Sequence, residues 1–271
     1  MKTDARRWAV ALACLAAAML AGCTEPFPSA SYVDQQRFLA VITDPLEAAP
    51  GEEVSFSALV TNKDGSLYDG PVAWAVVSMA MMSGQDIDPN DVYLQQPGEA
   101  AFVWTVPDAE DLPAKFGPPE RNGYLVTVTA TAFKNGDPQG EQLSATKLFI
   151  ISDRPADERR INPTIASLEV QAGGEALTPD DEGRYETGRS SVTLVAEPET
   201  DLGDLTYHWF ATDEDFAPQL EHKQKFDPNG RGEYAVYLVL RQSYYFGHDD
   251  ATSTRVTGAD WRRVVVAFTG E

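Results

Sequence analysis

From Arg37 onward, apolar and polar residues alternate in short segments that end at Gly, Pro, Asn or Asp. In one of these segments, Val54, Phe56, Ala58 and Val60 are separated by mostly polar residues. Such alternation is typical of half-buried β-strands, and no segment of helical length carries a sustained apolar stripe. The pattern predicts an all-β protein. The predicted strands are residues 38–43, 54–62, 72–78, 100–106, 124–133, 143–152, 165–171, 191–197, 205–210, 234–242 and 261–268.

A charged run bounded by prolines divides these strands into two sets. Residues 153–163 read DRPADERRINP, and a polar, proline-containing stretch of this kind is typical of a domain boundary. The sequence therefore predicts two domains in tandem, at residues 37–152 and 164–271, with residues 153–163 as the linker.

The two halves repeat the same order of sequence features. PGEEVSFSALV is followed by VAWAVV in the first half, and TGRSSVTLVAE is followed by LTYHWF in the second. Later, NGYLVTVTATAF corresponds to RGEYAVYLVLRQ. Trp74 and Tyr124 are 50 residues apart, whereas Trp209 and Tyr234 are 25 apart. The first domain is therefore predicted to carry an insertion within residues 79–122.

A tryptophan on the third strand and a tyrosine that opens a late strand after glycine resemble the framework of immunoglobulin-like sandwiches. Trp74 and Trp209 match the tryptophan, and Tyr234 and Tyr124 match the tyrosine. The second half is similar to bacterial PKD-type domains in its LTYHWF and GEYAVYLVL strands, although it lacks their glycine-aspartate-glycine turn. The resemblance implies two Greek-key β-sandwiches, with the tryptophans between the sheets and the tyrosine hydroxyls bonded to nearby backbone. It implies no catalytic residue, because this fold hosts many unrelated functions.

The first 22 residues have the pattern of a secretory signal peptide. Basic residues precede an unbroken apolar run of 13 residues from Trp8 to Leu20, which is shorter than the roughly 20 residues that span a bilayer. The sequence Leu20-Ala21-Gly22-Cys23 resembles the lipobox of bacterial lipoproteins. That resemblance implies cleavage before Cys23, a diacylglyceryl group on its thiol and an acyl chain such as palmitate on its amine. Two or more chains anchor a protein stably in a membrane.

Residues 23–36 are predicted to be a lipidated tether. They contain two prolines and small polar residues without apolar periodicity, and they could extend to at most about 50 Å. Thr24 stands where many enterobacteria-like systems carry the aspartate that marks inner-membrane retention. By that resemblance, we expect a place in the bacterial cell envelope at the outer membrane, facing either the periplasm or the cell surface.

The charge of the chain restricts its partners. The formal net charge is -21, and cleavage before Cys23 would remove three basic residues and one acidic residue, which leaves -23. A surface of this sign repels phosphate backbones, so we expect no nucleic-acid partner. The expected partners are the membrane, through the N-terminal lipid, and a protein or glycan in the envelope or outside the cell.

The sequence offers little that could perform catalysis. Cys14 would leave with the leader and Cys23 would carry lipid, so the folded part contains no cysteine for a disulfide or a thiolate metal site. Nucleophile-elbow, zinc-protease, P-loop and dinucleotide-binding patterns are missing, and only three histidines occur. We therefore expect no enzyme activity and no cofactor.

Acidic residues supply one candidate metal site. In an immunoglobulin-like domain, the loop after the second strand and the loop before the last strand emerge at the same end. Carboxylates grouped there would suit Ca²⁺, which takes six to eight oxygen ligands, although they would equally form a solvated acidic rim. The candidate ligands are Glu199, Asp201, Asp204, Asp249, Asp250 and Asp260.

The same last loop is predicted to begin with Tyr244, Tyr245 and Phe246. Three adjacent aromatic residues could form a face for a glycan or peptide, or could cap the domain core with alternate rings turned inward. Three functions therefore stay open: a non-catalytic adhesion, scaffold or spacer lipoprotein, a glycan- or peptide-binding module, and a hydrolase. The first is favoured, because the distinctive residues are those of cores and turns.

Overall fold

The computed structural model describes residues 31–78, 93–98, 100–117, 119, 123–137, 139–199, 204–246 and 254–270. The stretch Ser31–Glu271 forms one compact unit. The predicted leader and Cys23 lie outside the described residues. Within the described ranges, none of the helices has the length and apolar character needed to cross a membrane.

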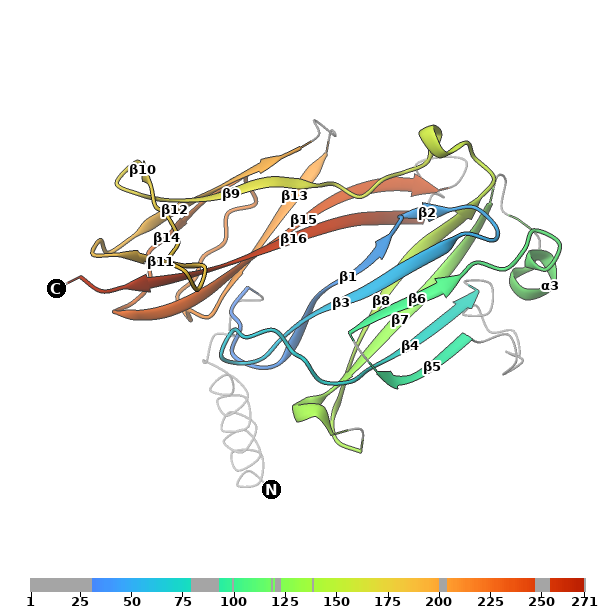
Figure 1. Cartoon of the computed structure of the whole chain (residues 1–271), viewed down its shortest axis with the longest axis horizontal. Helices are drawn as coiled ribbons and strands as arrows, with labels where there is room; N and C mark the ends of the chain where they lie inside the picture. The colour runs from blue at the N-terminus through green and yellow to red at the C-terminus, as the bar shows by residue number, and fades with distance from the viewer. Residues whose placement is uncertain are drawn as a thin grey trace, which may run out of the picture. The chain divides into compact units, whose positions relative to one another are not determined.

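Two facing sheets form a first β-sandwich (Figure 1). One sheet has the strand order β1-β3-β6, and the other has the order β2-β8-β7-β4-β5. All pairings are antiparallel except that of β2 with β8, which is parallel. The strands are β1 (Arg37–Asp44), β2 (Glu47–Ala48), β3 (Glu53–Thr61), β4 (Val72–Ser78), β5 (Tyr93–Gly98), β6 (Ala101–Thr105), β7 (Gly123–Phe133) and β8 (Gln142–Ser152).

A second sandwich follows in the chain and is built in the same way. Its sheets have the orders β10-β9-β12-β14 and β11-β16-β15-β13. The pairing of β11 with β16 is parallel and the others are antiparallel. The strands are β9 (Ile165–Ala172), β10 (Glu175–Ala176), β11 (Arg184–Thr187), β12 (Val192–Pro198), β13 (Leu205–Ala211), β14 (Lys223–Phe226), β15 (Gly232–Phe246) and β16 (Thr254–Phe268).

The shared topology is that of an immunoglobulin-like domain. In each sandwich the first long strand pairs with the next long one, β1 with β3 and β9 with β12. Between them, a short strand crosses to the opposite sheet and lies parallel to the last strand, β2 on β8 and β11 on β16. This is the Greek-key arrangement of two packed sheets. The predicted all-β fold with two immunoglobulin-like sandwiches is confirmed.

The region of the predicted insertion adds a strand and a helix to the first sandwich. β5 and α3 (Leu112–Phe116) have no counterpart between β13 and β15, whereas β6 occupies the place of β14. Leu112 and Phe116 are buried in the first core, and the Phe116 ring meets Trp104 edge-on with ring centroids 6.4 Å apart. The helix α3 therefore contributes two side chains to the first core.

Both framework tryptophans lie in the cores, as the sequence predicts. Trp74 is buried and stacks on Phe56 with ring centroids 6.1 Å apart. Trp209 is buried in the second core, where its Nε1 donates a 3.0 Å hydrogen bond to the Glu221 carbonyl. Tyr234 instead lies edge-on between two buried phenylalanine rings, and its hydroxyl makes no hydrogen bond within the described residues.

The sequence prediction for residues 243–260 was wrong at both ends. It assigned a loop between strands 234–242 and 261–268, whereas β15 continues to Phe246 and β16 already begins at Thr254. The ladder runs without a break from Gly232–Phe268 to Phe246–Thr254. The reason is that the first sandwich covers the outer half of this hairpin (Figure 1). Apolar and polar residues therefore do not alternate there as they do in a strand with one solvent-exposed face.

Candidate functional site

The β15–β16 hairpin joins the two sandwiches through two apolar clusters, which we call the hairpin joint. One cluster unites β1 and β3 with β15 and β16, and the other unites the region of β2, β7 and β8 with the outer half of the hairpin. Its buried members are Leu39, Ala40, Leu59, Ala235, Tyr237, Val239 and Ala259 in the first cluster and Leu46, Leu125, Ile150, Phe246 and Val256 in the second. Burial of this apolar surface on both sides favours one fixed arrangement of the joint.

The loop after β3 closes one end of the joint. The Gly65 carbonyl accepts hydrogen bonds from the Tyr237 hydroxyl and, at 3.1 Å, from Arg263 Nε. Gly65 has φ +74°, and a Cβ there would lie 2.6 Å from the side chains of Ala235 and Thr212. Only glycine allows both this backbone conformation and this close approach.

The aromatic run at the end of β15 belongs to the joint and is not a loop. Phe246 is buried in the second cluster, and Tyr244 packs against that cluster and donates a 2.7 Å hydrogen bond to the Ile161 carbonyl. Tyr245 points the other way and is 58% exposed. Of the two arrangements that the sequence left open, the alternate rings turned inward match the cap and not the three-ring face, because alternate residues of a strand point to opposite sides.

The described acidic candidates do not form a cluster. Asp201, Asp249 and Asp250 lie outside the described residues, and Glu199 and Asp204 are exposed. The Asp260 carboxylate accepts hydrogen bonds from the Ile165 amide at 2.8 Å, the Trp261 amide at 2.7 Å and Arg262 Nη1 at 3.1 Å. Over the described ranges, no three His, Cys, Asp or Glu side chains come together as a metal site.

Arg160 of the linker contacts both sandwiches, and its partner in the first is the buried side chain of Glu47. Arg160 donates to Glu47 Oε2 from Nη1 at 2.9 Å and from the backbone amide at 3.1 Å, and Ser152 donates to Oε1. Arg160 also donates from Nη2 to the Tyr245 carbonyl at 3.0 Å. Burial alone would raise the pKa of Glu47, but the hydrogen bonds from Ser152 and Arg160 outweigh it and lower the pKa.

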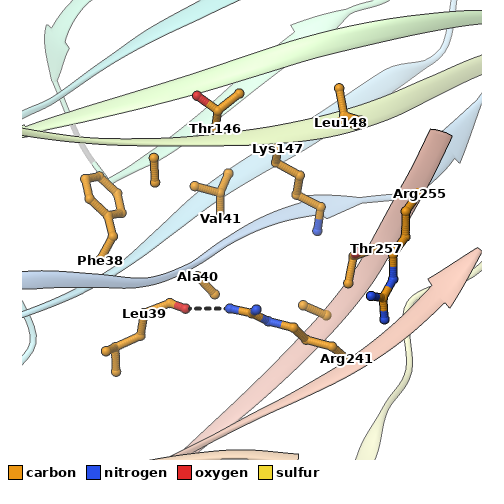
Figure 2. A pocket seen from close by; sticks show the side chains of 12 residues that line it. Phe38, Leu39, Ala40, Val41, Thr146, Lys147, Leu148, Arg241, Arg255 and Thr257 are labelled. Atoms are coloured by element: carbon orange, nitrogen blue, oxygen red, sulfur yellow. Dashed lines mark hydrogen bonds between the residues drawn. The ribbon is translucent and has the colours of Figure 1, made fainter. Parts of the chain in front are cut away.

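Beside the joint lies a pocket of about 450 Å³ whose only charged lining residues are basic. It opens between β1 and β8 of the first sandwich and is closed by β15 and β16 (Figure 2). Among the described residues that line it, none is acidic. The lining residues are Phe38, Leu39, Ala40, Val41, Ala145, Thr146, Lys147, Leu148, Arg241, Arg255, Thr257 and Ala259.

Lys147 is the unusual group in this pocket. It lies on the core-facing side of β8, between Ala145 and Phe149, and its side chain is directed toward Arg241 and Arg255 (Figure 2). Lys147 is 9% exposed, and its ammonium makes no hydrogen bond or ion pair with the described residues. Burial, with a smaller contribution from the charge of Arg241, lowers the pKa of Lys147 to about 7.

Both arginines are held in place by hydrogen bonds to uncharged groups, which do not neutralise their positive charge. β1 bulges between Phe38 and Ala40, and the carbonyl of the bulged Leu39 accepts a 3.1 Å hydrogen bond from Arg241 Nη2. Arg255 donates from Nε to the Ser243 hydroxyl at 2.7 Å. Burial, and then the neighbouring charge of Arg255, lowers the pKa of Arg241.

A nearby histidine experiences the same positive charge. His208 on β13 is half-buried, and burial followed by the charges of Arg241 and Arg255 lowers its pKa. Sequence reasoning did not identify this pocket. One signal was present, since Lys147 interrupts the apolar face of Ala145, Phe149 and Ile151 in a strand, but Arg241 and Arg255 reach the pocket only through the extended hairpin.

Comparison with known proteins assigns no family to the chain. No family model matches the sequence, and no curated protein matches it. The structure is similar to dimeric latent PorU from Porphyromonas gingivalis, with a TM-score of 0.25 and 11% identity over 87% of this chain and 24% of that one. Fibronectin(III)-like modules of Clostridium thermocellum CbhA give a TM-score of 0.24 and 9% identity, over 87% of this chain and 95% of theirs. The D0-D1 domain of intimin gives 0.24 and 13%, over 86% and 99%.

Proposed function

We propose that this chain is a non-catalytic lipoprotein of the bacterial envelope whose two sandwiches serve as a scaffold or adhesion module at a membrane surface. The observation that carries the proposal is the hairpin joint. Flexibly linked domains share little buried surface, whereas here two apolar clusters and the linker hydrogen bonds connect the sandwiches. A joint of this kind suits a protein that holds a binding surface at a set distance and orientation.

The proposal includes lipid attachment at Cys23 and residence at the outer membrane. The lipobox-like sequence at residues 20–23 and Thr24 support both parts. The aromatic residues 244–246 contribute to the joint and leave only one exposed ring. The scaffold function is therefore favoured over a binding face on which glycans would stack.

Substitution of Cys23 tests the anchor. In the Cys23→Ser variant we expect the protein to move from the membrane fraction to the soluble fraction, because the lipid-bearing thiol is gone. Cell fractionation and metabolic labelling with a palmitate analogue measure this change. Cys14→Ser is the matched control, since it removes the other cysteine of the leader and should leave membrane binding and labelling intact. An unlabelled, soluble wild-type protein would refute the anchor.

Cooperative unfolding tests the joint separately from the anchor. We expect a single calorimetric transition for the wild type, since unfolding of either sandwich exposes the clusters of the other. Phe246→Asp places a charge in the second cluster and should split the transition into two. Tyr245→Asp is the matched control, because this neighbouring ring is 58% exposed. Two transitions in the wild type would show independent sandwiches and would remove the support for a fixed scaffold.

A further inference from the structure

The positive charge of the basic pocket contrasts with the negative net charge of the chain. The chain has a formal net charge of -21, yet Lys147, Arg241 and Arg255 converge on one hollow with no acidic group among its described lining residues. By contrast, the largely buried guanidinium of Arg160 has an acidic partner in Glu47. A buried ammonium without a partner is costly, so its presence calls for a compensating group of opposite charge.

The walls of the pocket also indicate the shape and polarity of a ligand. Phe38, Val41 and Leu148 supply apolar surface beside the cations, and about 450 Å³ is within the range of small-molecule pockets. Guanidinium groups present planar pairs of N–H donors that match a carboxylate, and an ammonium adds a point charge. Arg241 and Arg255 each use one N–H in the bonds to Leu39 and Ser243, which orients the side chains and leaves further donors.

We propose that this pocket binds a small organic carboxylate, whose charged group lies between Lys147, Arg241 and Arg255 and whose apolar body lies against Phe38, Val41 and Leu148. The carboxylate could belong to a free acid or to the C-terminus of a peptide, since both present the same group. The site needs the two sandwiches to be held together by the joint, but it does not depend on the lipid anchor, and it uses neither Tyr244–Phe246 nor the acidic residues considered for Ca²⁺.

Binding should draw a proton into the pocket. With a pKa of about 7, Lys147 is largely neutral at pH 8 in the free protein, and a bound anion favours its charged form. The other ionisable groups that face it are Arg241 on β15 and Arg255 on β16, and the charges of both arginines also lower the pKa of His208 on β13. The arginines stay protonated, and His208 has a lowered pKa, so the proton taken up at pH 8 is assigned to Lys147.

Titration calorimetry of the full chain in a non-ionic detergent tests the site. The probes are benzoate, its neutral isostere benzamide, and inorganic phosphate, which has charge without an apolar body. We expect saturable benzoate binding in the millimolar range, about tenfold weaker or undetectable binding of benzamide and phosphate, and proton uptake at pH 8 in buffers of different ionisation enthalpy. A short peptide with a free C-terminal phenylalanine, compared with its amidated form, distinguishes the peptide source from the free acid.

Matched variants complete the test. Lys147→Met should weaken benzoate binding about tenfold or more and abolish proton uptake, and Lys147→Arg should retain binding without proton uptake. Lys223→Met, at an exposed position of β14, should change neither. Three results would overturn the proposal: no saturable binding of any carboxylate probe, equal binding by wild type and Lys147→Met, or binding of phosphate in preference to benzoate. Far-UV and near-UV circular dichroism of each variant establishes that the fold is intact.

Discussion

Lys147→Met is expected to stabilise the protein at pH 6, although it removes a charged residue from a strand. In the wild type an ammonium is buried beside Arg241 and Arg255 without an acidic partner, and its pKa falls from 10.5 to about 7. Since each pKa unit corresponds to about 1.4 kcal/mol, a shift of this size amounts to roughly 5 kcal/mol against the charged form. Methionine fills a similar volume and packs against the apolar walls without that penalty.

The pH dependence of stability has a definite sign. The folded-state pKa of Lys147 lies below its unfolded value, so its penalty is fully present below about pH 7 and is relieved as the pH rises toward 10.5. Between pH 7 and 8.5 this effect raises the wild-type free energy of unfolding by about 2 kcal/mol, and Lys147→Met should lose that rise. Urea denaturation of both proteins at pH 6, 7 and 8.5 measures it. A variant less stable than the wild type at pH 6 would show that the ammonium is already compensated.

The same substitution connects stability with the proposed ligand. If a carboxylate occupies the pocket, benzoate should narrow the stability difference between wild type and Lys147→Met, because the ligand binds the folded wild type more tightly than the folded variant. The exposed Lys223→Met variant should lack the gain in stability, and benzoate should stabilise it as much as it stabilises the wild type. The loss of stability caused by the unpartnered lysine is then explained by its role in binding. Binding residues commonly lower the stability of the folded protein.

The long strands could be predicted because each is long enough to show several alternations of apolar and polar residues. Residues 54–60 and 124–133 have a clear apolar face, and the structure places them in β3 and β7. The sequence did not predict β2, β10, β11 or β14, which have two to four residues. A segment of that length shows no period, and its pairing is decided by neighbouring strands. β14, with the sequence KQKF, is held by its ladder with β12.

The candidate site was harder to predict because it depends on contacts between distant parts of the chain. Arg241 meets the Leu39 carbonyl across 202 residues, and this contact requires both the bulge in β1 and the extension of β15. The aromatic run at 244–246 was assigned to a loop for the same reason, since the partner that covers Phe246 comes from the first sandwich. Local patterns indicate which face of a strand is apolar and not which element covers it.

Among single changes to the polar contacts of the linker, Glu47→Gln should cause the largest decrease in the free energy of unfolding. The carboxylate is 1% exposed and binds Arg160 through two hydrogen bonds, with Arg154 Nε 3.7 Å away. Glutamine keeps the shape but removes the charge, which leaves the largely buried Arg160 guanidinium without its counter-ion. Loss of one partner from a buried ion pair costs about 3–5 kcal/mol, and we expect a decrease of that order in the free energy of unfolding.

Glu52→Gln is the matched control, because its ion pair joins the same linker at the surface. Arg159 Nη1 lies 2.6 Å from Glu52 Oε2, but the Glu52 side chain is 44% exposed. Solvent screens such a pair, and its loss should cost at most about 1 kcal/mol. Both variants are measured by urea denaturation at pH 7. Equal effects would mean that burial of Glu47 does not determine its contribution.

Acid provides an independent measure of the same contact. The pKa of Glu47 is lowered below 4.5 in the folded state, so its contribution to stability is present above that pH and is lost as the pH falls through the folded-state pKa. Stability curves of the wild type and Glu47→Gln should therefore converge in acid, while those of the wild type and Lys147→Met should differ most below pH 7. Because the two effects fall in different pH ranges, one pH series on the three proteins separates the contribution of the linker from that of the pocket. Parallel curves for Glu47→Gln and wild type down to pH 3 would exclude Glu47 as the charged centre of the linker.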